Sequence, residues 1–303
     1  MTHRAIVPLF AIAFMLAGAG AGLAQDAGLF LRHRQAQGDK ATYVYSCSTR
    51  AQTRVGNSRK TERAQVSLQM KLTTEVLETT PGGDMRIRAD ITSGNIKASA
   101  GRHQQTVPVK SAVLEYLVSG QGVTKRVNLT SGKPPTIGLL PYTATPDDVF
   151  LASGVGRFPD KRLKPGDTWE GVARIPSTEG GGAMEVPFKS KLVSVGEVRG
   201  RPCATIKTTA RAVSTDDKPA EDGSRLLSVH MDVAQELTWA FDYERGVVVS
   251  AQGTTRISLA LRDTGSGSGA SGSARISGVM NTRATLLEFN GQKVPKEEAA
   301  PTG

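Results

Sequence analysis

The sequence predicts an all-β protein made of long, curved antiparallel strands, arranged either as a half-barrel or as a large sandwich. Apolar residues alternate with polar ones through much of the chain, as at Val66, Leu68, Met70 and Leu72. Strand side chains point alternately to two faces, so this period predicts sheets with one buried face, which is typical of antiparallel strands. Glycine-rich turn signals separate the alternating stretches, and helical periodicity is nearly absent.

The first 24 residues predict an export signal. Arg4 precedes an apolar run over 5–16, and small residues at 22 and 24 suit signal peptidase. We therefore expect cleavage after Ala24 and a periplasmic or secreted protein that is soluble once the signal is removed. A retained N-terminal membrane anchor is the alternative.

Changes in composition predict the organisation of the rest of the chain. Four regions follow the signal: a basic β-rich half at 25–133, a proline-rich linker at 134–164, a second β-rich half at 165–290 and a flexible tail at 291–303. We expect one short helix in the linker at 145–150, because a capping threonine precedes a proline there. A Gly/Ser loop at 264–273 interrupts the second half.

The two halves show a weak internal duplication. Four matches occur in the same order, at offsets of about 120 residues: 38–39 with 166–167, 71–72 with 191–192, 85–88 with 204–207, and 114–123 with 237–247. Generic hairpin patterning is the alternative explanation. Whether the halves form one sheet or two domains is left open.

The longest alternation runs from Leu227 to Tyr243 and exceeds the length of an ordinary strand. It predicts either a bulge or bend near 234–236 or an extended, strongly curved sheet. One face of this stretch could form an apolar groove that shelters an acyl chain, with these candidate residues: Leu227, Val229, Met231 and Trp239. Core anchoring is the better interpretation for Trp239, as for Trp169, because the chain holds few aromatic residues.

Net charge is the most specific functional observation in the sequence. Residues 25–133 carry 17 Lys and Arg against eight Asp and Glu, whereas residues 134–303 carry 20 of each. A one-sided basic field favours an anionic partner, although it also occurs on a simply solvated sheet face. The candidate binding residues are Arg50, Arg54, Arg59, Lys60, Arg63, Arg86 and Arg88.

No pattern of catalytic or metal-ligating residues is present in the sequence. The histidines are isolated, no Cys-x-x-Cys pair occurs, and no nucleotide-binding fingerprint is found, so we expect no metal and no cofactor. The acidic pairs at 147–148, 216–217 and 242/244 leave a hydrolase as a remote alternative. Nucleic acid is not an expected partner, because no reading helix or aromatic platform is predicted.

The two cysteines, Cys47 and Cys203, lie in strand-like stretches of different halves. An exported chain can keep disulfides, so a bridge joining the halves is possible. Two small buried thiols are the equal alternative, because spacing alone does not establish the geometry of a bridge.

Three short segments of the second half are similar to segments of other proteins. They read KPGDTW at 164–169, GRPCATI at 200–206 and YERGV at 243–247. In these segments the chain resembles exported bacterial β-rich proteins of unknown function, a resemblance that implies no catalytic residues. In architecture alone it is similar to the curved half-barrels of periplasmic lipoprotein and lipid carriers.

The leading expectation is therefore a non-enzymatic exported protein of the cell envelope that binds an anionic surface or partner through its basic half. The main alternative is a lipid or lipoprotein carrier with an apolar groove on a curved sheet. The sequence leaves the oligomeric state and the identity of the ligand open.

Overall fold

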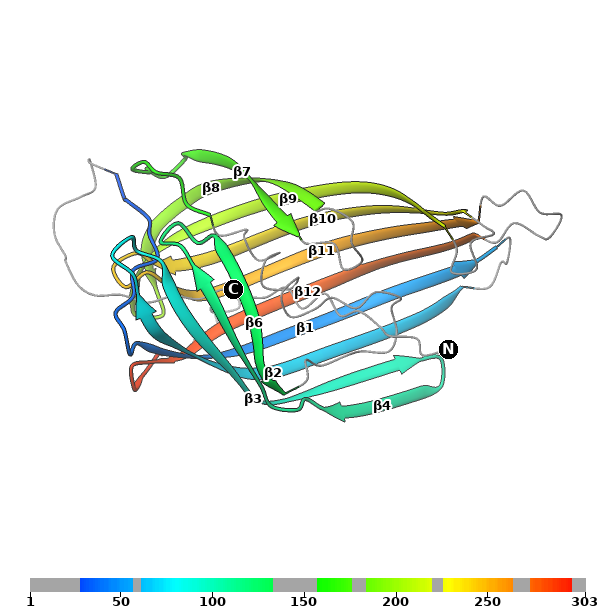
Figure 1. Ribbon diagram of the computed structural model, residues 1–303, viewed down its shortest axis with the longest axis horizontal. Coiled ribbons are helices and arrows are strands. Elements are labelled where there is room, and N and C mark those ends of the chain that lie inside the picture. The colour runs from blue at the N-terminus through cyan, green and yellow to red at the C-terminus, as the bar shows by residue number, and fades with distance from the viewer. Residues whose placement is uncertain are drawn as a thin grey trace, which may run out of the picture.

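A computed structural model describes residues 28–56, 61–132, 157–175, 184–219, 226–263 and 273–295 of the chain. These residues form one open antiparallel sheet of 13 strands, and they contain no helix (Figure 1). The strands are β1 (Lys40–Val55), β2 (Glu62–Thr79), β3 (Met85–Ala100), β4 (His103–Pro108), β5 (Ala112–Val118), β6 (Thr124–Gly132), β7 (Thr168–Ile175), β8 (Met184–Val198), β9 (Arg201–Pro219), β10 (Leu226–Asp242), β11 (Val247–Asp263), β12 (Ser273–Phe289) and β13 (Gln292–Lys293). The all-β prediction is confirmed.

The two halves of the chain belong to a single sheet. Its order is β6-β5-β3-β2-β1-β12-β11-β10-β9-β8-β7, with β4 beside β3 and β13 beside β12. The first and last long strands, β1 and β12, pair along their whole length and join the halves at the centre. The curved open sheet is therefore correct, and the described strands do not form the sandwich.

Each long strand has an inward face and an outward face. In β1, Ala41, Tyr43, Tyr45 and Cys47 are buried, whereas the residues between them are more exposed. The register extends this alternation across the sheet, because Tyr45 lies opposite Met70 on β2 and Ala284 on β12. We call the face that contains Tyr45 inward and the opposite face outward.

Two extended segments, 28–36 and 157–164, close one end of the inward face, which we call the capped end. They pair with each other through Leu29 and Leu163, which exchange two backbone hydrogen bonds of 2.7 and 2.8 Å. The His33 amide also donates to the Gly120 carbonyl at 2.8 Å, which fixes the first segment to the turn between β5 and β6. The strands run from this end to the open end, at the right of Figure 1.

The capped end holds the best-packed part of the core. Phe158 is 1% exposed, and its ring centroid lies 4.7 Å from that of Phe241 and 5.0 Å from that of His33. Gly246 allows the first segment to cross the sheet here. Its φ is +68°, and a Cβ at this position would lie 2.4 Å from the Arg34 amide nitrogen.

The predicted duplication is visible in the sheet order and in a repeated turn. In the first half, the Gly38 amide donates to the Val76 carbonyl, and the Val76 amide donates to the Asp39 carbonyl. In the second half, the Gly166 amide donates to the Leu192 carbonyl, and the Leu192 amide donates to the Asp167 carbonyl. One extra residue forms a bulge directly after this turn contact in each half: Leu77 after Val76, and Val193 after Leu192. The strand order β6-β5-β3-β2-β1 also repeats as β11-β10-β9-β8-β7.

One of the four predicted matches needs correction. The sequence paired Leu72 with Leu192, but the hydrogen bonds make Val76 the equivalent of Leu192. The pairing of 85–88 with 204–207 is supported, since Ile87 lies opposite Val76 and Ile206 lies opposite Leu192. Apolar residues at every second position made the register of this match ambiguous by an even number of residues.

The long alternation at 227–243 is one uninterrupted strand. β10 pairs with both β9 and β11 through 234–236, so the predicted bulge there is wrong, and the alternative of an extended sheet is correct. A register shift lies instead at Ala240 and Phe241.

Glycines on the inward face bring neighbouring strands close, since a Cβ at Gly94 would lie 2.5 Å from the Gln69 carbonyl oxygen.

Several predicted segments fall outside the described residues: the signal at 1–24, the short helix at 145–150 and most of the Gly/Ser loop at 264–273. Residues 291–295, which the sequence assigned to the tail, pack on the sheet, because β13 pairs with β12 and Val294 is 6% exposed. No helix in the described part of the chain has the length and hydrophobicity needed to cross a membrane.

Candidate functional site

The inward face divides into two parts along the strands. Towards the capped end, its apolar residues form one continuous core. Towards the open end, a patch of large apolar residues lies beyond that core. This inward strip consists of Met231 and Val233 on β10, Ile257, Leu259 and Leu261 on β11, and Ile276 on β12.

The register makes the inward strip continuous across three strands. Leu259 lies opposite Met231 on one side and opposite Ile276 on the other. Except for the buried Leu259, the side chains of the strip are half-buried. Neighbouring inward positions on β12 and β1, such as Gly278 and Ala51, carry little or no side chain. The side chains next to the strip are therefore short, and the strip stands above the sheet surface beside it.

Polar residues mark the boundary between the core and the inward strip. Thr255 and Gln235 lie opposite each other on β11 and β10, with exposures of 1% and 8%. The Thr255 hydroxyl is buried and has no hydrogen-bond partner among the described residues. An unsatisfied buried hydroxyl is unfavourable by about 1–3 kcal/mol, so this position is suited to a polar group of a ligand.

The four predicted groove residues all occupy inward positions of β10. Met231 belongs to the inward strip. Trp239 is instead part of the core, where its Nε1 donates to Thr208 Oγ1 at 3.2 Å. Of Leu227 and Val229, only the backbone pairing is described. The core interpretation of Trp239 and Trp169 is thus confirmed.

The outward face has a separate feature on its five central strands. We define the outward tract as the outward positions of β3 at 93–99, β2 at 63–71, β1 at 44–54, β12 at 273–285 and β11 at 250–262. It includes no Asp or Glu. Its nine basic residues are all exposed: Arg50, Arg54, Arg63, Lys71, Lys97, Arg256, Arg262, Arg275 and Arg283.

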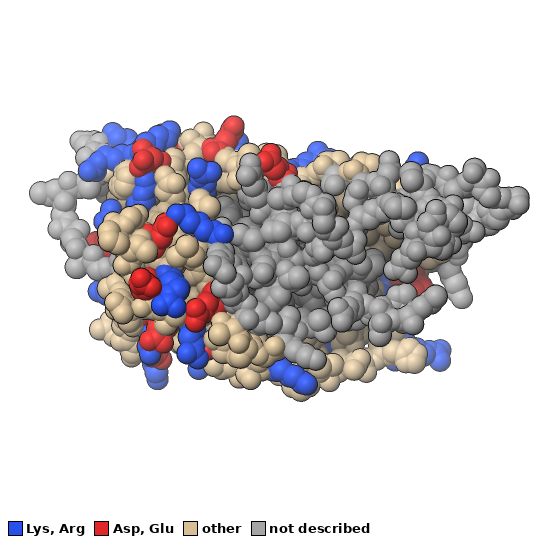
Figure 2. Space-filling model, in the orientation of Figure 1, with Lys and Arg blue, Asp and Glu red and all other residues tan. Residues whose placement is uncertain are grey.

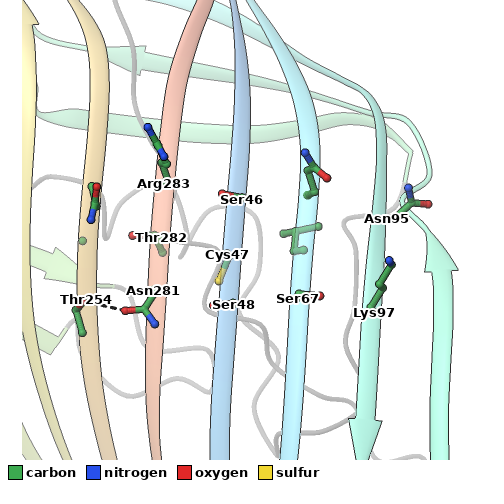
Figure 3. Close-up of a pocket in the computed structure, with 14 residues that line it drawn as sticks. Ser46, Cys47, Ser48, Ser67, Asn95, Lys97, Thr254, Asn281, Thr282 and Arg283 are labelled. Carbon is green, nitrogen blue, oxygen red and sulfur yellow. Dashed lines mark hydrogen bonds between the residues drawn. The ribbon is translucent and has the colours of Figure 1, made fainter. Parts of the chain in front are cut away.

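A groove of about 600 Å³ hollows the middle of the outward tract (Figure 3). The outward side chains that line it carry hydroxyl or amide groups, except for the two basic residues Lys97 and Arg283. Thr254 Oγ1 donates to Asn281 Oδ1 at 3.0 Å across two of its strands. The volume lies within the ordinary range for ligand pockets, about 300–1,000 Å³, and the lining is more polar than the mainly apolar lining of most such pockets.

The predicted anion-binding residues separate into three groups. Arg50, Arg54 and Arg63 lie in the outward tract, as predicted. Arg59 and Lys60 lie outside the described residues. Arg86 and Arg88 also point outward, but they lie towards the other end of β3 and form ion pairs with acidic side chains.

Acidic neighbours neutralise this last group. Arg86 lies 3.3 Å from Glu78 and 3.4 Å from Glu115, and Arg88 lies 3.0 Å from Asp90. The Asp90 hydrogen bond and charge raise the pKa of Arg88. Basic and acidic side chains also alternate over the capped end in Figure 2.

The basic residues of β11 and β12 were not among the predicted binding residues. Counting charges by halves assigned the whole excess to 25–133, because acidic residues on β10 and elsewhere balanced the second half. In the sheet, β12 and β11 lie directly beside β1, and Arg275 faces Arg54 across the strand pair. Alternation within 250–285 would have placed these arginines on the polar face, but strand order was needed to place them beside β1.

The two acidic pairs on described strands lie towards opposite ends of the sheet, since Asp242 ends β10 and Asp216 lies opposite Val229 near its start. Asp242 is 1% exposed and accepts hydrogen bonds from Arg201 at 3.0 Å and from the Glu244 and Arg245 amides. It therefore stabilises the turn after β10. Asp216 and Asp217 lie in β9, and 147–148 is not described. No group of three His, Cys, Asp or Glu suited to a metal occurs among the described residues.

Cys47 and Cys203 are free, buried thiols, so the possible bridge is not formed. Their strands, β1 and β9, are separated by β12, β11 and β10. Four strand spacings correspond to about 19 Å, far beyond the span of a disulfide. Burial raises the pKa of Cys203 to about 12 and also raises that of Cys47.

Comparisons with known proteins assign the chain to no family. No protein-family model matches the chain, and no curated protein matches it. Among solved structures, a lipovitellin described for its lipid–protein interactions has 12% identity and a TM-score of 0.44, and the match covers 88% of this chain and 27% of that one. The chain thus spans about a quarter of the lipovitellin. Pseudomonas aeruginosa OccK7 has 10% identity and a TM-score of 0.25, over 83% of this chain and 100% of that one.

Proposed function

We propose that this protein is an exported, non-catalytic carrier that binds the hydrocarbon chain of a lipid against the inward strip. The observation that carries the proposal is the position of the strip. Six large apolar side chains form a continuous surface that does not belong to the core of the described residues. A ligand that covers the strip accounts for this apolar area outside the core. Each methylene that the ligand buries there contributes about 0.8 kcal/mol to the binding free energy.

The polar boundary of the strip gives the ligand an orientation. A chain lying over Leu259 and Ile257 towards the core reaches Thr255 and Gln235. The buried Thr255 hydroxyl can donate to an oxygen atom of a carboxyl, ester or phosphate group, which removes its unfavourable burial. The preferred ligand is thus an amphiphile with its polar group near these two residues.

The direct test is native mass spectrometry of the full exported protein, followed by organic extraction of bound molecules. A stoichiometric lipid mass supports the proposal. The complementary assay is titration with a fluorescent fatty acid, which we expect to bind with saturation and to be displaced by unlabelled fatty acid. Absence of both bound lipid and saturable uptake of the probe would overturn the carrier function.

A pair of substitutions on β11 locates the site. Leu259→Glu places a charge in the inward strip, and we expect it to weaken fatty-acid binding by more than about tenfold. Ser258→Glu places the same charge on the outward face, one residue away, and should leave binding unchanged. If Leu259→Glu impairs folding, Met231→Gln is the milder variant, and circular dichroism verifies the sheet in each. Equal effects of the inward and outward changes would exclude the strip as the site.

A further inference from the structure

We propose that the outward tract is a second binding site, which takes an acidic polysaccharide: a sugar chain that carries carboxylate, sulfate or phosphate groups at intervals. This site lies on the opposite face of the sheet from the inward strip, and the proposal stands independently of the carrier function. The evidence consists of the charge pattern, the chemistry of the neutral positions and the groove.

The charge pattern of the outward tract differs from that of the flanking strands. On the flanks, basic residues meet acidic ones across strands, as in Arg211–Asp232 at 2.9 Å and Lys189–Glu170 at 2.8 Å. In the outward tract no acidic residue lies between the basic ones, and the ion pair of Arg256 runs to Glu236 on β10, outside the tract, at 3.9 Å. Nine exposed basic side chains with no acidic residue between them create a positive potential over this face. An anionic partner accounts for it.

The neutral positions of the outward tract are suited to sugars. Apart from Val44, Val279 and Ala260, every neutral residue in it is Ser, Thr, Asn or Gln. Serine, asparagine and glutamine are not among the residues enriched in strands, so strand formation alone does not explain their presence here. Their hydroxyls and amides both donate and accept hydrogen bonds, as the hydroxyl groups of a sugar chain require.

The groove arranges these groups in rows across the central strands. In one row, Ser48 on β1 lies between Ser67 on β2 and Asn281 on β12. In the next, about 7 Å further along the strands, Arg50 and Arg256 flank Val279. A chain that extends from the groove towards the open end thus meets hydroxyl and amide groups first and guanidinium groups next.

The composition of the outward tract favours a polysaccharide over other polyanions. Seven of its nine basic residues are arginine, whose planar guanidinium binds carboxylate, sulfate or phosphate through two parallel hydrogen bonds. No aromatic residue is present in it, so bases have nothing to stack on and the face has no group that anchors in a lipid bilayer. The partner that fits is therefore a polar, flexible, anionic chain.

The test measures binding of the full protein to alginate oligosaccharides, with neutral dextran, phosphatidylglycerol vesicles and a single-stranded DNA oligonucleotide as competing probes. We expect saturable binding to alginate that weakens as ionic strength rises from about 50 to about 200 mM, and none to dextran. Stronger binding to the vesicles or to the DNA than to alginate would overturn the assignment in favour of that polyanion.

Three variants show whether binding occurs at the outward tract. Arg50→Gln combined with Arg256→Gln should weaken alginate binding by about tenfold or more. Arg86→Gln combined with Arg88→Gln removes the same net charge outside the tract and should change binding by less than about twofold. Asn281→Asp keeps the bond from Thr254 and adds a negative charge in the groove, so it should weaken binding about as much as the first pair.

Fatty-acid binding measured in the same variants separates this site from the carrier function. We expect it to stay unchanged, because every substituted residue lies on the outward face. If the Arg86 and Arg88 variant weakens alginate binding as much as the Arg50 and Arg256 variant, attraction is a property of overall charge and the site does not exist.

Discussion

The capped end and the open end of the inward face differ in what their apolar residues contact. At the capped end, two extended segments and the strands form a continuous core around Phe158 and Phe241. At the open end, the same strands continue with apolar inward positions that do not belong to that core. One alternating pattern therefore serves stability at one end and, in the proposed function, binds the ligand at the other. Substitutions at the two ends should have unequal effects on folding.

The largest expected difference is on β12, which runs through both ends. Leu286 is fully buried in the core, whereas Ile276 is half-buried in the inward strip. We expect Leu286→Ala to lower the free energy of unfolding by about 3 kcal/mol, because it leaves a cavity among fixed neighbours. Ile276→Ala should lower it by less than about 1 kcal/mol.

Urea unfolding of the two β12 variants measures this difference. Circular dichroism verifies that each keeps the strand content of the unsubstituted protein. Equal losses of stability would mean that the open end is packed as tightly as the capped end. The inward strip would then be part of the core and would have no capacity for a ligand.

A smaller effect is expected from the glycine at which the closing segment crosses the sheet. Gly246→Ala introduces a Cβ 2.4 Å from the Arg34 backbone and forces a side chain into a positive φ. We expect a loss of about 2 kcal/mol in the free energy of unfolding. Gly196→Ala is the control, since its Cβ would meet nothing within 4 Å and its φ is not positive. Thermal unfolding of both variants that gives equal midpoints would show that the crossing is not held at Gly246.

The sequence predicted much of the fold because the physical signal is local. Alternation reports the buried face of each strand without reference to its neighbours, so the buried sides of the strands around Met70 and Trp239 were predicted correctly. Strand order is not local. That Arg54 would face Arg275, more than 200 residues away, depends on the pairing of β1 with β12, which no spacing in the sequence encodes.

The candidate sites show the same division. The arginines at 50, 54 and 63 were found because they are close in sequence, and Met231 was found because it belongs to one long alternation. Ile257 and Ile276 join Met231 only through cross-strand register. Arg86 was grouped with the other arginines because its partners, Glu78 and Glu115, are brought to it by strands on either side and not by sequence.

The smallest expected effect concerns the thiols, which differ in exposure only slightly and lie in different parts of the core. Burial raises the pKa of Cys203 to about 12, with a further contribution from the nearby Asp242 carboxylate. The folded state thus favours the protonated thiol. Its contribution to stability is complete below the ordinary thiol pKa near 9 and is lost as the pH rises towards 12.

Two measurements test this behaviour of the thiols. A thiol-specific reagent at about pH 8 should label neither cysteine in the folded protein and both after unfolding without reductant. Raising the pH to about 10.5 should lower the free energy of unfolding less in Cys203→Ala than in the unsubstituted protein, since only the latter ionises this thiol on unfolding. The buried Tyr43 and Tyr45 are present in both proteins, so the difference isolates Cys203. Failure to label either cysteine in the unfolded, unreduced protein would instead show a disulfide and require β1 and β9 to approach each other, which contradicts the open sheet.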